Sequence, residues 1–300
     1  MKLYAPAYYP SFACIADQCT HSCCIGWEID VDEDTYDFYQ TLQGDYAKEI
    51  RCSMEGSDPP HFSLTGDERC PHLDERGLCR IITAYGHDAL CEICREHPRF
   101  YHQTPRGMEV GLGLCCQEAC RIVLSSDDFD QMLPIGELDT SPDAQAFDAL
   151  DMRGQVYDLL RAPDLSHKDK LQRISDTFSV SPAHASDQAW CALLNSLEYL
   201  DESHRALFAA YRSSFATPPE QAPLLVRALA YFVFRHCSDA DDAQDFRARL
   251  GLALLLERLL CSLITSGQDP YEAARILSEE IEYSEDNTDT LRSAFEEVCL

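Results

Sequence analysis

The chain has 300 residues, of which 45% are hydrophobic and 25% charged; this composition is ordinary for a globular protein and excludes disordered, collagen-like and coiled-coil chains. Its 52 acidic residues against 24 basic ones give a formal net charge of −28. A chain of this charge repels the phosphate backbone, which argues against a nucleic-acid binder. No run of 18 apolar residues occurs, so no membrane span is expected.

The most informative residue type is cysteine, because twelve of the 16 cysteines lie in the first 120 residues. Such a density indicates either disulfides or metal ligands. The N-terminal sequence lacks the uninterrupted apolar region of a secretory signal, because Pro6 and Pro10 break it. We therefore expect a cytoplasmic protein in a reducing environment, where clustered thiols serve as metal ligands more often than as disulfides.

The first 125 residues are rich in turn signals, and their predicted elements are short. One helix is expected to begin near Asp32 or Asp34, and a second to cover residues 88–97 and end before Pro98. Residues 108–114 alternate apolar and small side chains, which is typical of a strand or an extended segment. Residues 125–145 are acidic and contain Pro and Gly, so we expect them to connect two halves of the chain.

Residues 145–300 show helical periodicity. Long apolar helices are expected over 222–236 and 244–265, another is expected to begin at Pro270, and a last one at about Asp289. Ser181 precedes Pro182 as an N-cap precedes the first helical position. Inward-facing residues are expected at Trp190, Leu193, Leu194, Leu197, Leu200, Leu207, Tyr211 and Phe215. The predicted fold is mainly α: an irregular cysteine-rich metal-cluster domain over 1–125 and an all-α helical domain over 145–300.

The twelve N-terminal cysteines form three clusters and one isolated position. Short gaps within a cluster allow one loop to bring several sulfur atoms to one metal centre. Twelve thiols exceed one four-ligand site, so either two centres or several spectator thiols are expected. The clusters are Cys14-x4-Cys19-x3-Cys23-Cys24, then Cys70, Cys79 and Cys91-x2-Cys94, then Cys115-Cys116-x3-Cys120, with Cys52 alone between the first two.

Zinc and iron–sulfur centres remain alternative interpretations of this pattern. Zinc ribbons use paired Cys-x2-Cys units, and only one such unit, at Cys91 and Cys94, occurs here. The irregular spacing of the other cysteines favours an iron–sulfur cluster. A closed zinc site would make the segment a structural module, whereas an iron–sulfur cluster can carry electrons or bind a cofactor.

Several motifs resemble the flagellin lysine-N-methylase family and its broader relative, a zinc- or iron-chelating cysteine-cluster domain. The clear matches cover residues 12–122. They are Phe12-x-Cys14-x4-Cys19-x3-Cys23-Cys24-x-Gly26-Trp27, Cys70-Pro71-x-Leu73, Gly77-Leu78-Cys79-x-Ile81, Leu90-x3-Cys94-x3-Pro98-Arg99 and Leu114-x-Cys116-x-Glu118-Ala119. Gln117 stands where the family motif often has Pro.

The resemblance implies a cytoplasmic enzyme that methylates lysine ε-amines of flagellin or another lysine-bearing protein, with S-adenosylmethionine as methyl donor. It also implies a [4Fe-4S] cluster, and the metal-ligand positions that match are Cys14, Cys19, Cys23, Cys24, Cys70, Cys79, Cys94 and Cys116. The alternatives are a non-enzymatic zinc- or iron-binding module and an electron-transfer protein. Neither alternative predicts a methylated product.

Three residues beside the cysteine motifs are candidates for cofactor or substrate contacts. Trp27 either packs against the cluster loop or stacks on a ligand, and Arg99 either neutralises thiolate charge or forms a surface ion pair. Glu118 either orients a substrate amine or has a structural role at a helix N-terminus. The sequence contains no Rossmann fingerprint, since Gly111-x-Gly113 lacks a third glycine, and it identifies no catalytic base.

Overall fold

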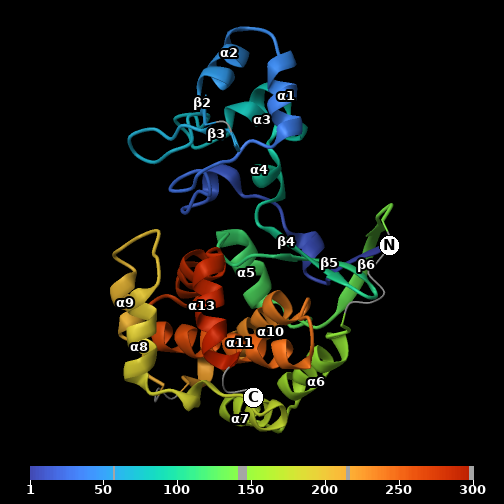
Figure 1. Ribbon diagram of the computed structural model, residues 1–300, viewed down its shortest axis with the longest axis vertical. Coiled ribbons are helices and arrows are strands. Elements are labelled where there is room, and N and C mark those ends of the chain that lie inside the picture. The colour runs from blue at the N-terminus through green and yellow to red at the C-terminus, as the bar shows by residue number, and fades with distance from the viewer. Residues whose placement is uncertain (57, 141–146, 214–216, 297–300) are drawn as a thin grey trace. The chain divides into compact units, whose positions relative to one another are not determined.

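The computed structural model describes residues 1–56, 58–140, 147–213 and 217–296. The protein is mainly α-helical with a small sheet, as the sequence predicts (Figure 1). It divides into two compact units: Ala13–Arg99, here called the cysteine-rich unit, and Met1–Phe12 with Phe100–Leu300, here called the helical unit. These units differ from the expected boundaries of 1–125 and 145–300. The reason is that the first twelve residues and the cysteine-containing segment 107–125 pack with the helices of the second half.

The cysteine-rich unit is built from short elements separated by turns. Asp32 is the N-cap of α1, as predicted, and its carboxylate accepts hydrogen bonds from the Thr35 and Glu92 amides, so one side chain joins the first turns of α1 and α4. The elements are η2 (Ala16–Gln18), α1 (Glu33–Thr41), α2 (Asp45–Cys52), β2 (Met54–Glu55), β3 (His61–Phe62), α3 (Arg80–Tyr85), η3 (His87–Ala89) and α4 (Glu92–Glu96).

The core of this unit is small and includes thiols. Apolar side chains such as Val31, Tyr39 and Phe62 pack with Cys70 and Cys91, all of them buried. The Tyr39 hydroxyl donates to the Ala89 carbonyl at 2.8 Å, which satisfies its buried polar group. The unit therefore encloses cysteine side chains among its largest apolar residues.

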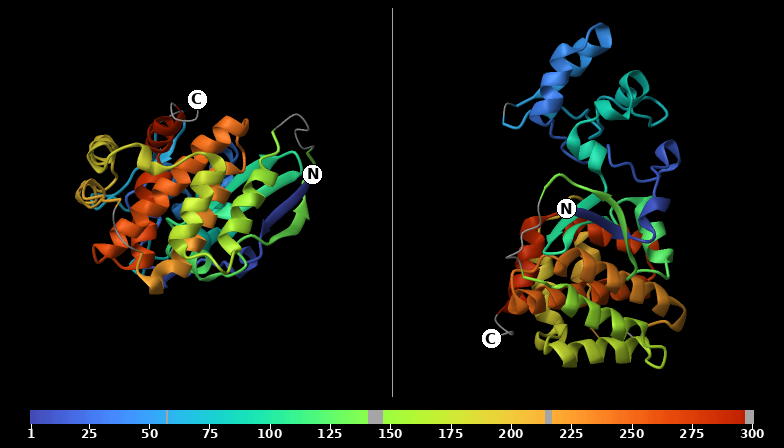
Figure 2. Two further views of the ribbon diagram at one scale, coloured as in Figure 1. Left: turned by 90° about the horizontal axis from the view of Figure 1, so that it is seen from below. Right: turned by 90° about the vertical axis from the view of Figure 1, so that its right-hand side faces the viewer.

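A four-stranded sheet belongs to the helical unit. Its order is β4-β5-β1-β6, in which β1 is parallel to β5 and antiparallel to β6. Figure 2 shows β1 beside β6 at the sheet. The strands are β1 (Lys2–Pro6), β4 (Arg99–Thr104), β5 (Gly107–Leu112) and β6 (Met132–Glu137), and the turn η1 (Tyr9–Ser11) follows β1.

Helices form the rest of this unit and lie around α10 and α11 (Figures 1 and 2). α11 packs against α10, α12 and α13, while α10 also contacts α5, α6 and α7. Their bounds are α5 (Gln117–Ser125), α6 (Leu150–Arg161), α7 (His167–Phe178), η4 (Pro182–His184), α8 (Asp187–Ser196), α9 (Arg205–Ala209), η5 (Pro219–Gln221), α10 (Ala222–Cys237), α11 (Ala243–Thr265), α12 (Pro270–Leu277), η6 (Ser278–Glu282, a π-helical turn) and α13 (Glu285–Glu296).

The predicted helices are confirmed, with local corrections. Trp190, Leu194 and Leu197 are buried as expected, but Leu200 is 58% exposed because α8 ends at Ser196 and the chain turns. Phe215 lies outside the described residues. Within the described ranges, no helix has both the length and the apolar character that crossing a membrane requires.

Candidate metal centre

Five cysteine side chains of the cysteine-rich unit come together, and we call them the thiol group: Cys24, Cys70, Cys79, Cys91 and Cys94. The thiols of Cys24, Cys79 and Cys91 lie near enough to Cys70 to affect its ionisation. Those of Cys24, Cys70 and Cys91 affect Cys94 in the same way. The side chains of Cys91 and Cys94 hydrogen bond to each other. The first and last members of the group, Cys24 and Cys94, are 70 residues apart in the chain.

Backbone pairing fixes the positions of these side chains. The Cys70 amide donates to the Cys24 carbonyl at 2.8 Å, and an isolated bridge joins Ile25 to Arg69. A second bridge joins Leu73 to Cys79. Backbone pairing outside the helices therefore holds Cys24, Cys70 and Cys79 close together.

The other thiols are held at helix starts. Cys79 is the N-cap of α3, where the nearby Ile81 and Ile82 amides act to lower the pKa of its thiol. Cys91 is the N-cap of α4, and Cys94 lies one turn further on. Backbone donors at these positions favour the thiolate form, which is the form that binds metals.

Burial opposes that ionisation. It raises the pKa of the Cys70 thiol to about 12 and also raises the pKa of Cys79. A hydrogen bond from Cys23 lowers the pKa of Cys24 to about 7, and a hydrogen bond from Cys94 lowers the pKa of Cys91. A bound cation offsets the cost of burying several thiolates, so this donor set fits a metal whose binding releases protons.

The spacing of the thiols bears on the kind of metal. Among the described residues, no three cysteine sulfur atoms lie within 4.8 Å of one another. A tetrahedral zinc site with Zn–S bonds of about 2.3 Å places its sulfur atoms about 3.8 Å apart. An iron–sulfur cluster accepts one thiolate at each of several irons and so takes a wider arrangement. Both kinds of centre take thiolate ligands, so the donor set suits either one.

The predicted ligands are thus brought together in part. Cys24, Cys70, Cys79 and Cys94 belong to the thiol group. Cys14 and Cys23 are exposed members of the same unit, but the Cys23 side chain hydrogen bonds to that of Cys24; half-buried Cys19 donates to the His21 carbonyl at 3.0 Å. Cys52 is exposed at the end of α2.

Cys91 is the member of the thiol group that the family motif omits. The signal that identifies it in the sequence is the Cys-x2-Cys spacing to Cys94. Of the histidines nearby, His72 has both ring nitrogens occupied, with Ser53 Oγ at 2.9 Å and Tyr46 Oη at 3.3 Å. Hydroxyl partners on both nitrogens leave this imidazole without a lone pair for a metal.

Cys116 belongs to the helical unit, whereas the other predicted ligands belong to the cysteine-rich unit. It is the N-cap of α5 and, together with Cys115 and Cys120, forms a second group of thiols. Cys115 is buried, and burial raises its pKa to about 12. The cysteines of the first 120 residues thus form one group in each unit.

A buried charged network lies against this second group. Glu282, in the π-helical turn η6, accepts hydrogen bonds from His236 Nε2 at 2.8 Å and Tyr231 Oη at 3.0 Å. The Tyr231 hydroxyl also accepts a hydrogen bond from the Leu114 amide at 3.3 Å. The Arg235 guanidinium is within electrostatic reach of both Glu282 and Cys115. These hydrogen bonds hold the backbone next to Cys115 in place. The sequence analysis did not predict this network.

The remaining predicted residues have structural partners. Arg99 donates to the Arg95 carbonyl at 3.3 Å, and Trp27 is half-buried after Gly26. Glu118 forms a two-point ion pair with Arg121, at 2.6 and 2.8 Å, which lowers the pKa of this carboxyl. The placement of Glu118 favours its structural interpretation, while the Arg99 contact is a hydrogen bond to the backbone.

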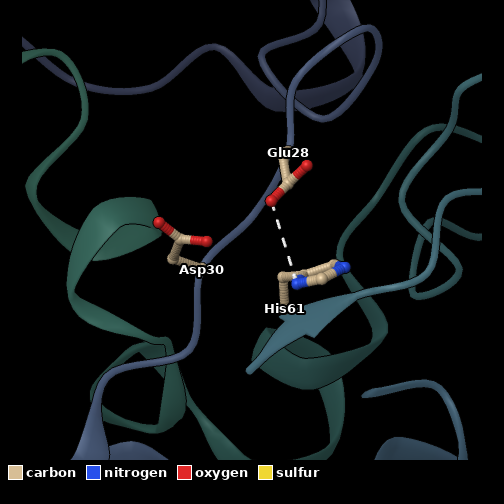
Figure 3. A group of neighbouring side chains, drawn as sticks. All are labelled: Glu28, Asp30 and His61. Atoms are coloured by element: carbon tan, nitrogen blue, oxygen red, sulfur yellow. Dashed lines mark ion pairs between the residues drawn. The ribbon is translucent and has the colours of Figure 1, made fainter. Parts of the chain in front are cut away.

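Another group of possible ligands, Glu28, Asp30 and His61, occurs in the cysteine-rich unit (Figure 3). His61 Nδ1 lies 3.8 Å from Glu28 Oε1, and its Nε2 lies 3.7 Å from Glu55 Oε1. Both carboxylates of the group are exposed. Exposed pairs of this kind contribute little to stability, and we treat the group as a surface ion pair.

The chain is similar over part of its length to known proteins. It is 30% identical over 132 residues to lysine-N-methylases of Salmonella typhimurium and Salmonella choleraesuis, a match that covers 41% of this chain and 32% of each relative. It is 29% identical over 132 residues to the flagellar biosynthetic protein FliU of Salmonella muenchen, covering 77% of that protein. The match spans about a third of the length of the lysine-N-methylases. No family model and no solved structure matches the chain. The resemblance found in the sequence is therefore confirmed as a distant relationship to lysine-N-methylases.

Proposed function

We propose that this protein is a lysine N-methyltransferase that uses S-adenosylmethionine and a [4Fe-4S] cluster to methylate flagellin in the cytoplasm. The observation that carries the proposal is the coincidence of two features. One is the distant relationship to lysine-N-methylases. The other is the set of five cysteine side chains that come together in one compact unit.

The thiol group is the proposed cluster site. Four thiolates suffice for one [4Fe-4S] cluster, so five leave one cysteine as a spectator or an alternative ligand. If only three thiolates held the cluster, the fourth iron would offer a coordination position to the amino and carboxylate groups of S-adenosylmethionine. This arrangement is consistent with the lack of a Rossmann fingerprint in the sequence.

The chemistry of methyl transfer sets what the protein must provide. In direct transfer, the neutral ε-amine of lysine attacks the methyl carbon of a sulfonium. The N–C bond forms, the C–S bond breaks with its electron pair left on sulfur, and the nitrogen then loses a proton. A lysine amine must be deprotonated first, which requires desolvation or a base. Glu118 is a weak base for this step, because Arg121 stabilises its carboxylate.

The charge of the chain supports a lysine-bearing protein substrate. A formal net charge of −28 attracts basic surfaces and speeds their encounter with this protein. The same charge repels nucleic acid. Flagellin is proposed because one relative is named as a flagellar biosynthetic protein.

The test is anaerobic purification followed by absorption spectroscopy, analysis of iron, sulfide and zinc, and a methylation assay with S-adenosylmethionine and flagellin. We expect equal amounts of iron and sulfide, and methyl-lysine detected by mass spectrometry. Cys79→Ser should lose most of the iron and the methyl transfer, because it removes a thiol-group sulfur. The matched control is Cys52→Ser, which changes an exposed cysteine and should retain both.

Other outcomes lead to different functions. Protein that contains only zinc and forms no methyl-lysine would identify a structural metal module. A cluster that is reduced and oxidised reversibly without methyl transfer would identify an electron-transfer protein. Equal loss of iron in both cysteine variants would contradict the assignment of the thiol group.

A further inference from the structure

The helical unit contains a cleft of about 1020 Å³, which we call the helical cleft. Its walls come from the first half of α7, the start of α10 and the middle of α11, together with the segments around 181–183 and 211–213 and Thr217. This volume is at the upper end of the range for small-molecule sites. None of its described wall residues belongs to the thiol group, so it is a separate candidate site.

The charge of this cleft is opposite to that of the chain. Four of its described wall residues are cationic: Lys168, Lys170, Arg227 and Arg258. The carboxylate among them, Asp127, is paired with Arg227 at 2.5 Å. Two of the four lysines in the whole chain therefore line one cleft, in a protein with 52 acidic and 24 basic residues. Such a local excess of positive charge attracts an anion.

One buried hydroxyl at the cleft lacks a hydrogen-bond acceptor. Tyr211 lines the cleft and is 1% exposed; the Arg258 guanidinium lies near its hydroxyl, and the hydroxyl finds no acceptor among the described residues. Burial raises the pKa of this phenol to about 12, so the hydroxyl keeps its proton and remains a donor. A buried donor without an acceptor costs stability, and a ligand oxygen would remove that cost.

A second polar group supports this wall. His167 lines the cleft, and its Nδ1 lies 2.9 Å from Thr217 Oγ1. Its Nε2 lies 3.2 Å from Oε1 of Glu257, which is fully buried. The two ring nitrogens of His167 thus face Thr217 and Glu257.

Apolar side chains form much of the remaining wall. They lie on the same three helices as the cationic residues, in the loop before α7, and in the segment between α5 and β6. Those that line the cleft are Phe129, Leu165, Leu171, Val226 and Leu254. A cleft with an apolar wall and a few charged groups is typical of sites for organic molecules.

We infer that the helical cleft binds an anionic organic molecule with an apolar body, whose carboxylate or phosphate group is held by the cationic wall and the Tyr211 hydroxyl. The inference is independent of methyl transfer, because it uses none of the residues of the proposed cluster site. The inferred anion would be a ligand distinct from those of the proposed cluster site.

The test uses anilinonaphthalene sulfonate, a fluorescent anion with an aromatic body, in titrations of the full chain. We expect saturable binding to the wild type. Lys168→Glu should weaken it by about tenfold or more, because it reverses a charge in the wall. The matched control is Lys48→Glu, which reverses the charge of an exposed lysine in the cysteine-rich unit. Circular dichroism melting curves establish that both variants are folded.

Tyr211→Phe tests the role of the hydroxyl separately. It should weaken probe binding several-fold while raising the melting temperature, because the unpartnered buried donor is removed. Displacement of the probe by adenosine monophosphate or by decanoate distinguishes a phosphate from a carboxylate ligand. The inference fails if binding is absent, if Lys168→Glu binds like Lys48→Glu, or if neither anion displaces the probe.

Discussion

The ion pair of Arg153 and Glu109 is the most buried interaction between charged side chains that joins a helix to the sheet. Both residues are at most 5% exposed. The guanidinium of Arg153 on α6 contacts both carboxylate oxygens of Glu109 on β5, at 2.5 and 2.8 Å, and also donates to Ser238 Oγ at 2.5 Å. This two-point geometry fixes α6 against β5 and satisfies both charges.

Arg153→Leu should lower the free energy of unfolding by about 3–5 kcal/mol, because it leaves the Glu109 carboxylate buried without its partner. The double variant Arg153→Leu with Glu109→Leu should recover much of this loss, since no unpaired charge remains. Urea unfolding at neutral pH measures both values. A double variant as unstable as the single one would show that packing around α6, and not charge, is lost.

At the residue scale, the cysteine spacing predicted part of the candidate metal site. Cysteine spacing identified Cys24, Cys70, Cys79 and Cys94, which the structure brings together. It could not show that Cys116 belongs to the other unit, because a motif records order along the chain and not packing. The partners of Glu282 were also missed, since a buried hydrogen-bond network leaves no periodic pattern.

At the scale of elements, the close packing of α11 and α13 depends on one glycine. A Cβ at Gly251 in α11 would lie 2.3 Å from the ring of Phe295 in α13. The ring is fully buried and contacts the Trp190 ring at a centroid distance of 5.5 Å. Helix α13 can therefore approach α11 only where the side chain is a hydrogen atom.

Two glycine-to-alanine changes should have opposite effects. Gly251→Ala should destabilise the protein by about 1–3 kcal/mol, because it forces the Phe295 ring to move in a packed core. Gly154→Ala in α6 has no atom within 4 Å of the new Cβ and should stabilise the protein by about 0.5–1 kcal/mol through helix propensity. Thermal or urea unfolding gives the sign of each change. Two changes of the same sign would contradict the packing argument.

Elements with local signals were predicted well. Helix α12 begins at Pro270 after its N-cap Asp269, and α11 ends at Thr265 as expected. Ser181 is an N-cap as predicted, but of the short turn η4. Strand β5 was expected as an extended segment, whereas β1 and β6 were missed. Their pairing joins residues more than a hundred positions apart, and no local pattern records such a contact.

For the whole molecule, the main finding is that one unit is inserted in another. Residues 13–99 follow β1 and precede most of β4, so the helical unit consists of two chain segments. Cysteine content suggested a boundary at residue 125, but composition does not report packing. Strand β5 and helix α5 carry or adjoin cysteines and still belong with α10 and α12.

The two units should respond differently to metal removal. The cysteine-rich unit has a small core that includes thiols, so metal binding should contribute directly to its folding. We expect hydrogen exchange in residues 13–99 to slow by at least tenfold when iron and sulfide are restored to metal-free protein. Exchange in α10 and α11 should change little, because their core is apolar. Mass spectrometry of deuterated peptides measures both regions, and an equal change in both would contradict this expectation.

The inserted arrangement also orders events during translation. Strand β1 leaves the ribosome about a hundred residues before its parallel partner β5, a delay of about 5–20 s at ordinary elongation rates. Residues 13–99 are synthesised entirely within that interval. The nascent chain can therefore complete its cysteine-rich unit while β1 still lacks a neighbour in the sheet.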